Sequence, residues 1–409
     1  MMTLPRLALC LLIFILTACA GPGFKTSKSD SPLILVSIDG FRADYFERGL
    51  TPNLEAIADT GVRATAMRPS FPSLTFPNHY TIVTGLYPDH HGIVNNTMVD
   101  PVLGNFSYKK SSELSARWWE GAEPLWVTAD KQGVRTATMF WPGSDVEIRG
   151  HRPDYYLPFN GKMTAGQRTD QVLAWLDQPA AKRPRFLTLY FEQLDHESHD
   201  HGPGSTEADA ALRAVDASIG HLVAELEKRD LYKNANLVIV SDHGMAETDA
   251  ERTVILDSIV DLAHIDLVTS GIAVGINPKP GYEAEVEHAL LAPRGHMQCW
   301  RKGELPARLH YGTHPRIPAL VCVPESGWLI ETKEFHSRPN HRMHGGEHGY
   351  DSADPHMRAL FIAHGPAFKR GLTVAEFDNV DVYPLLAHLL GIKPEPNDGN
   401  PATMREMLQ

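Results

Sequence analysis

Short runs of apolar, often β-branched residues recur along the chain and alternate with stretches whose apolar residues repeat at helical spacing. Apolar runs of this kind, bounded by polar residues, are typical of strands that are buried on both faces. They lie at residues 33–38, 136–140, 186–192, 237–240 and 360–363, and helices are predicted over 164–176, 207–228 and 380–390. The alternation predicts an α/β fold in which helices cover both faces of a mostly parallel central sheet.

The stretch Phe71–Asn96 departs from this alternation because two prolines, Pro72 and Pro77, bracket a single hydroxyl residue, Thr75. Proline fixes its own φ and lacks a backbone donor, so Thr75 is not expected deep inside a helix. The apolar spacing after Pro77 suits the start of a helix, and proline is tolerated in a first turn. Thr75 is therefore expected at a loop-to-helix junction, where helix N-termini hold anions. Taken alone, the stretch favours a simple turn threonine.

Three of the predicted strands end on aspartates, and histidines follow two of them. In parallel sheets, ligands collect at the carboxyl ends of the strands, so these side chains are expected to share one centre. His199 lies four residues after Asp195, which places both on one face if that segment is helical. The six candidate metal ligands are Asp39, Asp195, Asp242, His199, His243 and His348. Carboxylates with imidazoles suit zinc, with manganese or iron as weaker options, and six ligands allow three for each of two ions.

Such a pair of metals would change the interpretation of Thr75. Two ions roughly 4 Å apart can clamp both ends of an in-line phosphoryl displacement. Threonine is not nucleophilic at neutral pH, but coordination to a metal lowers the pKa of its hydroxyl and supplies the alkoxide. Thr75 is therefore a candidate nucleophile that fills the open position of one metal.

The overall composition and net charge limit which kinds of molecule the protein is expected to bind. The chain has 409 residues, a hydrophobic content of 43% and a formal net charge of -12. This charge argues against a protein that coats nucleic acid, although it does not exclude a nucleotide substrate. The 21 histidines are unusually many. The five near the motifs, His79, His90, His91, His196 and His201, are assigned no ligand role.

The N-terminus has the pattern of a targeting segment. Arg6 precedes an apolar run at 7–16, which is too short to span a bilayer and suits the core of a signal peptide. The run ends in L-T-A-C, which resembles the lipobox of bacterial lipoproteins, with Cys19 as the lipidated residue. We expect a signal peptide at 1–18 and a lipidated cysteine with its tether at 19–31, or alternatively an ordinary cleaved signal. The protein is then exported in a Gram-negative bacterium, to the periplasm or to the outer membrane, which it contacts only through this anchor.

Two cysteines remain after Cys10 and Cys19 are set aside. An even pair in an oxidising compartment predicts a disulfide between Cys299 and Cys322, and two buried free thiols are the alternative. Both lie in residues 246–341, which carry no repeated α/β signature. We interpret this segment as a smaller lobe inserted into a single catalytic domain at 32–409.

Five motifs together resemble the nucleotide pyrophosphatase/phosphodiesterase family of the alkaline phosphatase superfamily. They are I-D-G-F at 38–41, P-S-L-T-F-P-N-H-Y at 72–80 with T-G-L-Y-P and H-G-I-V-N-N following, Y-F-E-Q-L-D-H-E-S-H-D-H-G-P at 190–203, S-D-H-G-M at 241–245 and G-E-H-G-Y-D at 346–351. The resemblance implies an alkaline phosphatase-like fold and two Zn²⁺. One ion would be held by Asp39, Thr75, Asp242 and His243, and the other by Asp195, His199 and His348. It also implies a phospho-threonine on Thr75 and hydrolysis of phosphodiester or pyrophosphate bonds that releases nucleoside 5′-monophosphates.

The resemblance further assigns substrate contacts. Asn96 matches an asparagine that hydrogen-bonds a non-bridging phosphate oxygen, and Phe76 and Tyr190 match positions where rings lie against a nucleobase. Core aromatics are the alternative interpretation of both rings. In the third motif, Leu194 stands where the family usually has proline, and Ser198 where it usually has glycine. The neighbouring ligands Asp195 and His199 are kept, so these two changes put the local backbone geometry in doubt more than the metal site.

Other functions remain as alternatives. A phosphomonoesterase would add a cation beside its doubly charged phosphate, but Asn96 is neutral and Arg68 is the only cation close upstream of Thr75. A choline-phosphodiester hydrolase acting on lipid headgroups would share the motifs. A sulfatase would need a Cys or Ser nucleophile in a C/S-x-P-x-R pattern, which the chain lacks. A non-enzymatic surface lipoprotein would be expected to have lost a ligand, and none is missing.

Overall fold

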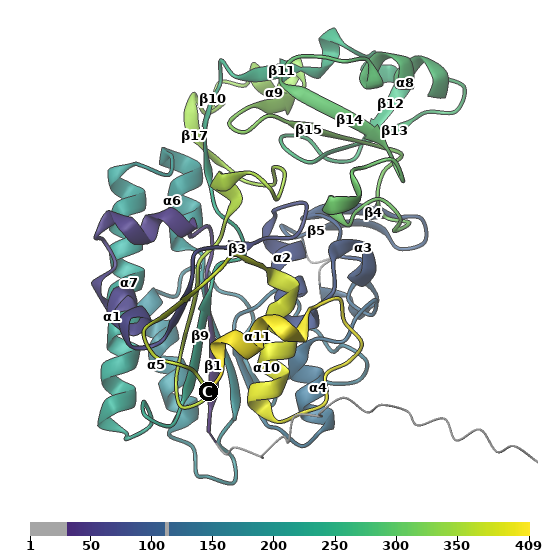
Figure 1. Ribbon diagram of the computed structural model, residues 1–409. Coiled ribbons are helices and arrows are strands. Elements are labelled where there is room, and N and C mark those ends of the chain that lie inside the picture. The colour runs from purple at the N-terminus through teal and green to yellow at the C-terminus, as the bar shows by residue number, and fades with distance from the viewer. Residues whose placement is uncertain (1–30, 111–113) are drawn as a thin grey trace, which may run out of the picture.

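An eight-stranded sheet runs through the centre of the computed structural model, which describes residues 31–110 and 114–409 (Figure 1). In spatial order its strands are β19 (Leu372–Val374), β2 (Val62–Ala64), β18 (Phe361–His364), β9 (Asn236–Val240), β1 (Leu33–Ile38), β8 (Phe186–Phe191), β6 (Thr136–Met139) and β7 (Tyr155–Tyr156). Only β18 runs antiparallel to its neighbours, β9 and β2. The predicted α/β fold with a mostly parallel sheet is confirmed.

Helices cover both faces of this sheet. One face carries α1 (Pro52–Thr60), α5 (Ala165–Leu176) and α7 (Thr206–Lys228), and the other carries α2 (Thr75–Thr84), α4 (Leu125–Lys131) and α10 (Val382–Leu390) (Figure 1). Alternate residues of β1 explain why its apolar run is unbroken. Ile34 and Val36 pack with the first set of helices, whereas Leu33 and Leu35 pack with the second. A strand between two helical layers has no solvent face, so both of its sides must be apolar.

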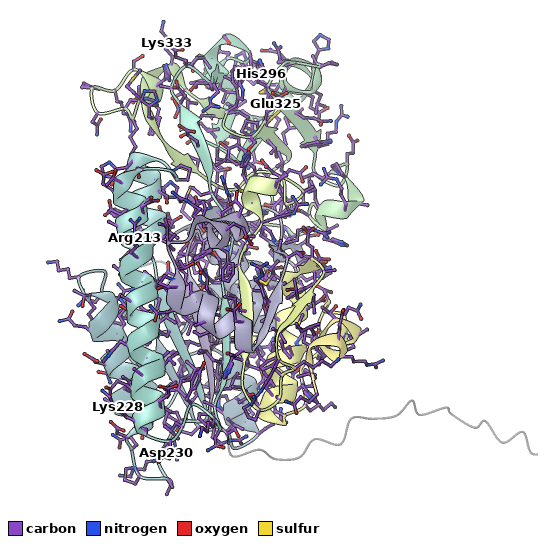
Figure 2. The ribbon with its side chains drawn as sticks, turned by 60° about the vertical axis from the view of Figure 1, so that its left-hand side comes forward. Arg213, Lys228, Asp230, His296, Glu325 and Lys333 are labelled. Atoms are coloured by element: carbon purple, nitrogen blue, oxygen red, sulfur yellow. A yellow bond between two sulfur atoms is a disulfide. The ribbon has the colours of Figure 1, made fainter. Side chains whose placement is uncertain are left out.

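The long helices end near the residues that the pattern predicted. The sequence predicted a helix over 164–176, and Thr164 instead caps α5, with its side chain accepting from the backbone N–H of Gln167. Ser205 caps α7 in the same way, through the N–H of Ala208. Such caps satisfy donors that have no partner inside the helix. Figure 2 shows α7 along one side of the molecule, with Arg213 and Lys228 at its surface.

Shorter elements surround this framework. They are β3 (Met67–Arg68), α3 (Pro88–His91), β4 (Thr97–Asp100), β5 (Gly104–Ser107), α6 (Gln193–His201), β20 (Phe377–Asp378) and α11 (Pro401–Met407). None of the helices in the described part of the chain combines the length and the apolar character needed to cross a bilayer. The predicted signal peptide at 1–18, Cys19 and all but the last residue of the tether lie outside the described residues.

A second, smaller group of strands lies beyond the carboxyl ends of the central strands (Figure 1). The chain leaves the main body through β10 (Ala246–Asp249) and returns through β17 (His344–Glu347), which pair antiparallel. Between them lie a four-stranded sheet, a parallel pair of strands and two α-helices. These are β12 (Ile265–Leu267), β13 (Val274–Pro278), β15 (Leu320–Pro324) and β14 (Met297–Arg301), then β11 (Thr253–Ile255) with β16 (Leu329–Glu331), and α8 (Glu283–Leu291) and α9 (Lys333–His336). We call residues 250–343 the lobe; its status as an insertion into one catalytic domain stays a prediction.

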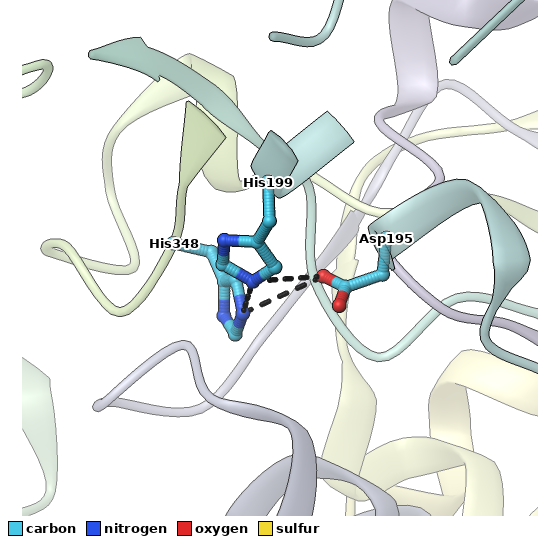
Figure 3. Close-up of side chains that lie close together, drawn as sticks. All are labelled: Asp195, His199 and His348. Atoms are coloured by element: carbon cyan, nitrogen blue, oxygen red, sulfur yellow. Dashed lines mark hydrogen bonds and ion pairs between the residues drawn. The ribbon is translucent and has the colours of Figure 1, made fainter. Parts of the chain in front are cut away.

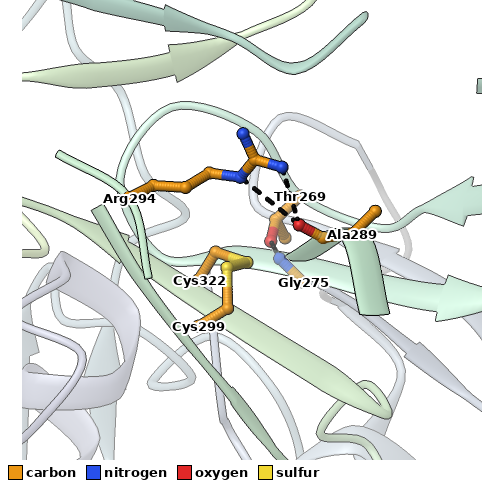
Figure 4. The surroundings of a disulfide bond; sticks show 6 residues. All are labelled: Thr269, Gly275, Ala289, Arg294, Cys299 and Cys322. Carbon is orange, nitrogen blue, oxygen red and sulfur yellow. Dashed lines mark hydrogen bonds between the residues drawn. A yellow bond between two sulfur atoms is a disulfide. The ribbon is translucent and has the colours of Figure 1, made fainter. Parts of the chain in front are cut away.

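The lobe contains the predicted disulfide. Cys299 on β14 is bonded to Cys322 on β15, and the two residues stand directly opposite each other in the antiparallel pair (Figure 4). Near the bond, Arg294 donates to the carbonyl of Ala289. Cys322 is buried in the lobe's own apolar cluster, so the bond joins the core of the lobe to the adjacent strand.

Candidate active site

Thr75 is the first residue of α2, two residues earlier than the helix start predicted after Pro77. Leu74 before it is extended, and Pro77 occupies the first turn, where its missing N–H removes no intrahelical bond. The hydroxyl Oγ1 of Thr75 lies 3.2 Å from Nε2 of His243. The junction expected from the two prolines therefore exists, and it aims the hydroxyl at a predicted metal ligand.

The sheet topology brings the three predicted aspartates together. Strands β8, β1 and β9 are neighbours and parallel, so their carboxyl ends meet at one edge. Asp39 follows β1 directly and Asp242 follows β9 after one residue, while Asp195 lies in α6, just after β8. Because β9 has already ended, the adjacent side chains of Asp242 and His243 can converge, with Nε2 of His243 2.9 Å from Oδ2 of Asp242.

The first half of the site is the triad Asp195, His199 and His348 (Figure 3). Oδ1 of Asp195 lies 3.5 Å from Nε2 of each histidine, and the two Nε2 atoms are 3.1 Å apart. Nδ1 of His199 donates to the carbonyl of Gly346 at 2.7 Å, and Nδ1 of His348 donates to that of Ser73 at 2.8 Å. A carbonyl only accepts, so in the neutral rings the proton is on Nδ1 and both Nε2 lone pairs face each other. Two facing lone pairs and a carboxylate oxygen are the donor set of a metal site.

The second half joins Asp39, Asp242 and His243. Nε2 of His243 lies 3.3 Å from Oδ1 of Asp39 as well as 2.9 Å from Asp242. Its Nδ1 donates to the carbonyl of Gly244 at 2.9 Å, which again leaves the Nε2 lone pair at the centre. Asp195 also lies within reach of Asp39 and His243, so the two halves form one continuous cluster. The structure thus brings together all six predicted ligands and the hydroxyl of Thr75.

Three carboxylate oxygens at this centre are buried and accept no hydrogen bond: Oδ1 of Asp39, Oδ1 of Asp195 and Oδ2 of Asp242. Each faces the imidazoles at contact distance, but without hydrogen-bond geometry. A buried anionic oxygen without a partner costs several kcal/mol. One such oxygen from each of three aspartates, all aimed at the same place, fits a site for divalent cations.

Burial and the charges of neighbouring side chains shift the pKa values of the residues in this cluster. Burial, then the charges of Asp242 and Asp195, raise the pKa of Asp39 well above its usual value. Burial alone would raise the pKa of Asp242, but His243 and His79 hold it well below its usual value. Burial would lower the pKa of His199, yet Asp195 and Glu347 raise it to about 10. Without a cation the cluster therefore retains protons, and a metal ion would displace them.

Tyr190 lies beneath the site, which does not fit the prediction that its ring meets a nucleobase. It is only 7% exposed, and its hydroxyl donates to Oδ2 of Asp39 at 2.5 Å. The ring packs edge-on against His79, with centroids 5.0 Å apart. Tyr190 orients Asp39 so that the other oxygen, Oδ1, points at the cluster.

His79, to which no ligand role was assigned, is a further support. Its Nε2 lies 2.9 Å from the hydroxyl of Ser37, and its Nδ1 lies 2.9 Å from the carbonyl of Thr75 and 3.2 Å from Oδ2 of Asp242. Although it belongs to a possible ligand group with Asp39 and Asp242, both of its nitrogens already have partners, and we assign it to orientation. The sequence signal was its spacing of four residues from Thr75, on the same face of α2.

Phe76 and Asn96 lie next to Thr75, and their contact with a substrate stays a prediction. The backbone N–H of Phe76 donates to Oδ1 of Asn96 at 2.9 Å, which fixes that amide beside Thr75. The Phe76 ring is half-buried, and its centroid lies 5.8 Å from that of Tyr108 and 6.0 Å from that of Trp119. With its Oδ1 occupied, Asn96 has its amide N–H groups to offer to an oxygen of the substrate.

The unusual residues of the third motif do not disturb the ligands. Leu194 and Ser198 are buried in α6, which is continuous from Gln193 to His201. Two glycines of β17 explain how His348 reaches His199. A Cβ on Gly345 would lie 2.5 Å from the carbonyl oxygen of His199, and one on Gly346 would lie 2.6 Å from that of Ser198. Only residues without a Cβ let β17 pack this closely on α6.

Comparisons with known proteins show which family the chain resembles. The family model for "Type I phosphodiesterase / nucleotide pyrophosphatase" matches residues 33–351. An uncharacterised pyrophosphatase/phosphodiesterase of Schizosaccharomyces pombe is 40% identical over 386 residues, which cover 91% of this chain and 80% of the relative. Ectonucleotide pyrophosphatase/phosphodiesterase family member 1 of Mus musculus is 39% identical over 392 residues, which cover 92% of this chain and 43% of that protein. The chain thus spans less than half of this longer relative.

A solved structure is equally similar. An inactive threonine-to-alanine variant of murine ectonucleotide pyrophosphatase/phosphodiesterase 5, in complex with AMP, superposes with a TM-score of 0.88. It is 34% identical in sequence, and the match covers 93% of this chain and 100% of that one. The likeness therefore extends over the lobe as well as the central sheet.

Proposed function

Because the chain belongs to the type I phosphodiesterase / nucleotide pyrophosphatase family, we propose that it hydrolyses phosphodiester and pyrophosphate bonds of nucleotides and releases nucleoside 5′-monophosphates. The observation that carries this proposal is the hydroxyl of Thr75, 3.2 Å from His243, at the point where three buried carboxylate oxygens lack partners. The related murine structure holds AMP and is inactive with a threonine replaced by alanine, which supports both the substrate class and a role for threonine.

We assign two Zn²⁺ to the cluster. Asp39, Thr75, Asp242 and His243 would hold one ion, and Asp195, His199 and His348 the other. The support is the convergence of Asp195, His199 and His348 and the contacts of His243 with Asp39, Asp242 and Thr75. When bound, the ions supply a lowered pKa for a coordinated hydroxyl and positive charge against the phosphoryl oxygens.

The residues of the chain then have distinct tasks. Oγ1 of Thr75 attacks phosphorus, the leaving group departs on the opposite side, and water later cleaves the phospho-threonine. Asn96, fixed by its bond from the N–H of Phe76, donates to a non-bridging oxygen. Tyr190 and His79 keep Asp39 and Asp242 aimed at the centre through their own hydrogen bonds and contacts. The N-terminus of α2 adds its dipole at the attacked phosphate.

The substrate contacts favour a diester. Asn96 is neutral, so it suits a phosphate with one negative charge better than a monoester, which carries about two near pH 7. The half-buried ring of Phe76 is our candidate for contact with a nucleobase. We no longer assign that contact to Tyr190, since its ring is buried.

We further propose that the protein is exported and is anchored by a lipid on Cys19. The support is the sequence of the N-terminal segment and the disulfide, which suits an oxidising compartment. Mass spectrometry of the purified mature protein tests this: a diacylated or triacylated N-terminal cysteine supports the anchor, and an unmodified N-terminus at another residue refutes it.

Hydrolysis of a bis-aryl phosphate and a mono-aryl phosphate, with and without zinc, tests the activity. We expect the diester to be cleaved faster and only with metal; faster turnover of the monoester would contradict the diesterase assignment. Thr75→Ala is expected to lower kcat by at least about 10³-fold while zinc content is retained. Thr60→Ala is the matched control, because the hydroxyl of Thr60 only donates to carbonyls of its own helix, at Ala56 and Ile57. Wild-type rates in Thr75→Ala would remove Thr75 as the nucleophile.

A further inference from the structure

A second group of metal-ligand side chains lies in the lobe, outside the candidate active site. Glu331 ends β16, His336 ends α9, and His341 lies in the segment that leads to β17. Oε2 of Glu331 lies 3.2 Å from Nδ1 of His336 and 2.9 Å from Nε2 of His341. Three side chains thus place one donor atom each at a common point.

The carboxylate at this point is buried and has little compensation for its charge. Glu331 is 5% exposed, and the side chain of His341 is 8% exposed. Within residues 31–110 and 114–409, the only ion-pair partners of Glu331 are these two histidines. No lysine or arginine pairs with it there, and a neutral imidazole can offer this carboxylate a hydrogen bond but no positive charge. A buried carboxylate without a cation is costly, so the arrangement favours a bound positive charge.

The donor set repeats that of the triad Asp195, His199 and His348, which also joins one carboxylate oxygen to two imidazole nitrogens. Zinc bonds of 2.0–2.1 Å in tetrahedral geometry separate neighbouring ligand atoms by roughly 3.3 Å. The nitrogen–oxygen distances around Glu331, 3.2 and 2.9 Å, are close to this spacing. In the triad the corresponding distances are both 3.5 Å. Both groups therefore hold their carboxylate oxygen within about 0.4 Å of the spacing expected around zinc.

We propose that Glu331, His336 and His341 bind a further divalent cation of the zinc class. The ligand atoms are Oε2 of Glu331, Nδ1 of His336 and Nε2 of His341, and water fills the fourth position on the side of His336, whose side chain is 33% exposed. The cation would link the two ends of the segment from Glu331, at the end of β16, to His341. From His341 the chain continues through β17 to His348. The cation is structural: it fixes this return segment and does not touch the reacting phosphate.

Zinc content measures this site directly. Wild-type protein and the double variant His336→Gln/His341→Gln are equilibrated with zinc, freed of excess metal by gel filtration, and analysed by mass spectrometry for zinc per chain. Glutamine keeps a hydrogen-bond donor for Glu331 but is a poor zinc ligand. We expect the double variant to bind one zinc fewer per chain, while its kcat for the diester stays within twofold of wild type. Equal zinc content in the two proteins overturns the proposal.

The matched control is His296→Gln. His296 also lies in the lobe and also pairs with a glutamate, Glu325 at 2.8 Å, but that pair is exposed and has no second imidazole (Figure 2). It is expected to keep the wild-type zinc content. If the double variant does not fold, anomalous diffraction at the zinc edge from zinc-saturated wild-type crystals decides. A peak among the three side chains supports the site, and its absence refutes it.

Discussion

Replacing Tyr190 with phenylalanine should weaken metal binding although Tyr190 touches no metal. The change removes one oxygen atom, the hydroxyl that donates to Oδ2 of Asp39 at 2.5 Å in a buried position. A hydrogen bond to a buried charged group contributes about 1.5–3 kcal/mol, and about 1.4 kcal/mol corresponds to a factor of ten in an equilibrium constant. Metal affinity at the Asp39 half should therefore fall roughly 10- to 100-fold, in line with the loss of other residues that orient metal ligands.

The assay is competition for zinc against a chelator of known affinity, with zinc retained per chain as the readout. Tyr190→Phe should release one zinc at a lower chelator concentration than wild type and should regain turnover when excess zinc is added. Tyr155→Phe is the matched control, because it also loses one hydroxyl hydrogen bond, to the carbonyl of Lys182 at 3.0 Å, but lies on the edge strand of the sheet. Wild-type affinity in Tyr190→Phe would refute the reasoning that this hydroxyl positions Asp39 for a metal.

Three further predictions follow from the same contacts. Asn96→Asp keeps an acceptor for the N–H of Phe76 but brings a negative charge to the phosphate, so kcat/KM for a diester should fall about 10²-fold with zinc content unchanged; unaltered kinetics would remove Asn96 from the site. In the metal-free protein, burial would lower the pKa of His199, but Asp195 and Glu347 raise it to about 10, above its value near 6.5 in the unfolded chain. Protonation of His199 therefore stabilises the fold fully below pH 6.5. This contribution to the free energy of unfolding is lost as the pH rises towards 10, with a slope of up to about 1.4 kcal/mol per pH unit. The Tm of the chelator-treated protein should accordingly fall between pH 6.5 and 9, and a flat profile would contradict this. Cys299→Ser/Cys322→Ser opens a loop with a sequence separation of 23 and should cost about 3 kcal/mol of stability of the lobe in chemical denaturation; equal unfolding curves for the variant and wild type would show that the bond contributes nothing.

Much of the candidate site could be predicted from local sequence. The central strands could be predicted because a strand between two layers of helices must be apolar on both sides, as β1 is. The aspartates after β1, β8 and β9 follow from the rule that parallel strands present their carboxyl ends at one edge. The spacing of Asp195 and His199 anticipates α6, and Pro77 locates the helix start to within two residues of Thr75.

The residues that orient these ligands could not be predicted in the same way. Tyr190 stands in an apolar strand, and the pattern does not reveal whether its hydroxyl meets Asp39 or a substrate. Gly345 and Gly346 become necessary only because β17 packs against the backbone of α6. The lobe shows no α/β pattern, since its short strands depend on partners far along the chain, such as β11 with β16.

The sequence by itself determined which residues we assign to the chemistry: the six predicted ligands, the hydroxyl of Thr75 and the two cysteines. Side-chain type and strand order are local properties, and a parallel sheet turns them into one site by a general rule. Only the tertiary structure decided what surrounds them: the burial of Tyr190 and His79, and the meeting of Glu331 with His336 and His341. These depend on contacts between side chains from separate elements, whose distances and burial no periodicity along the chain records.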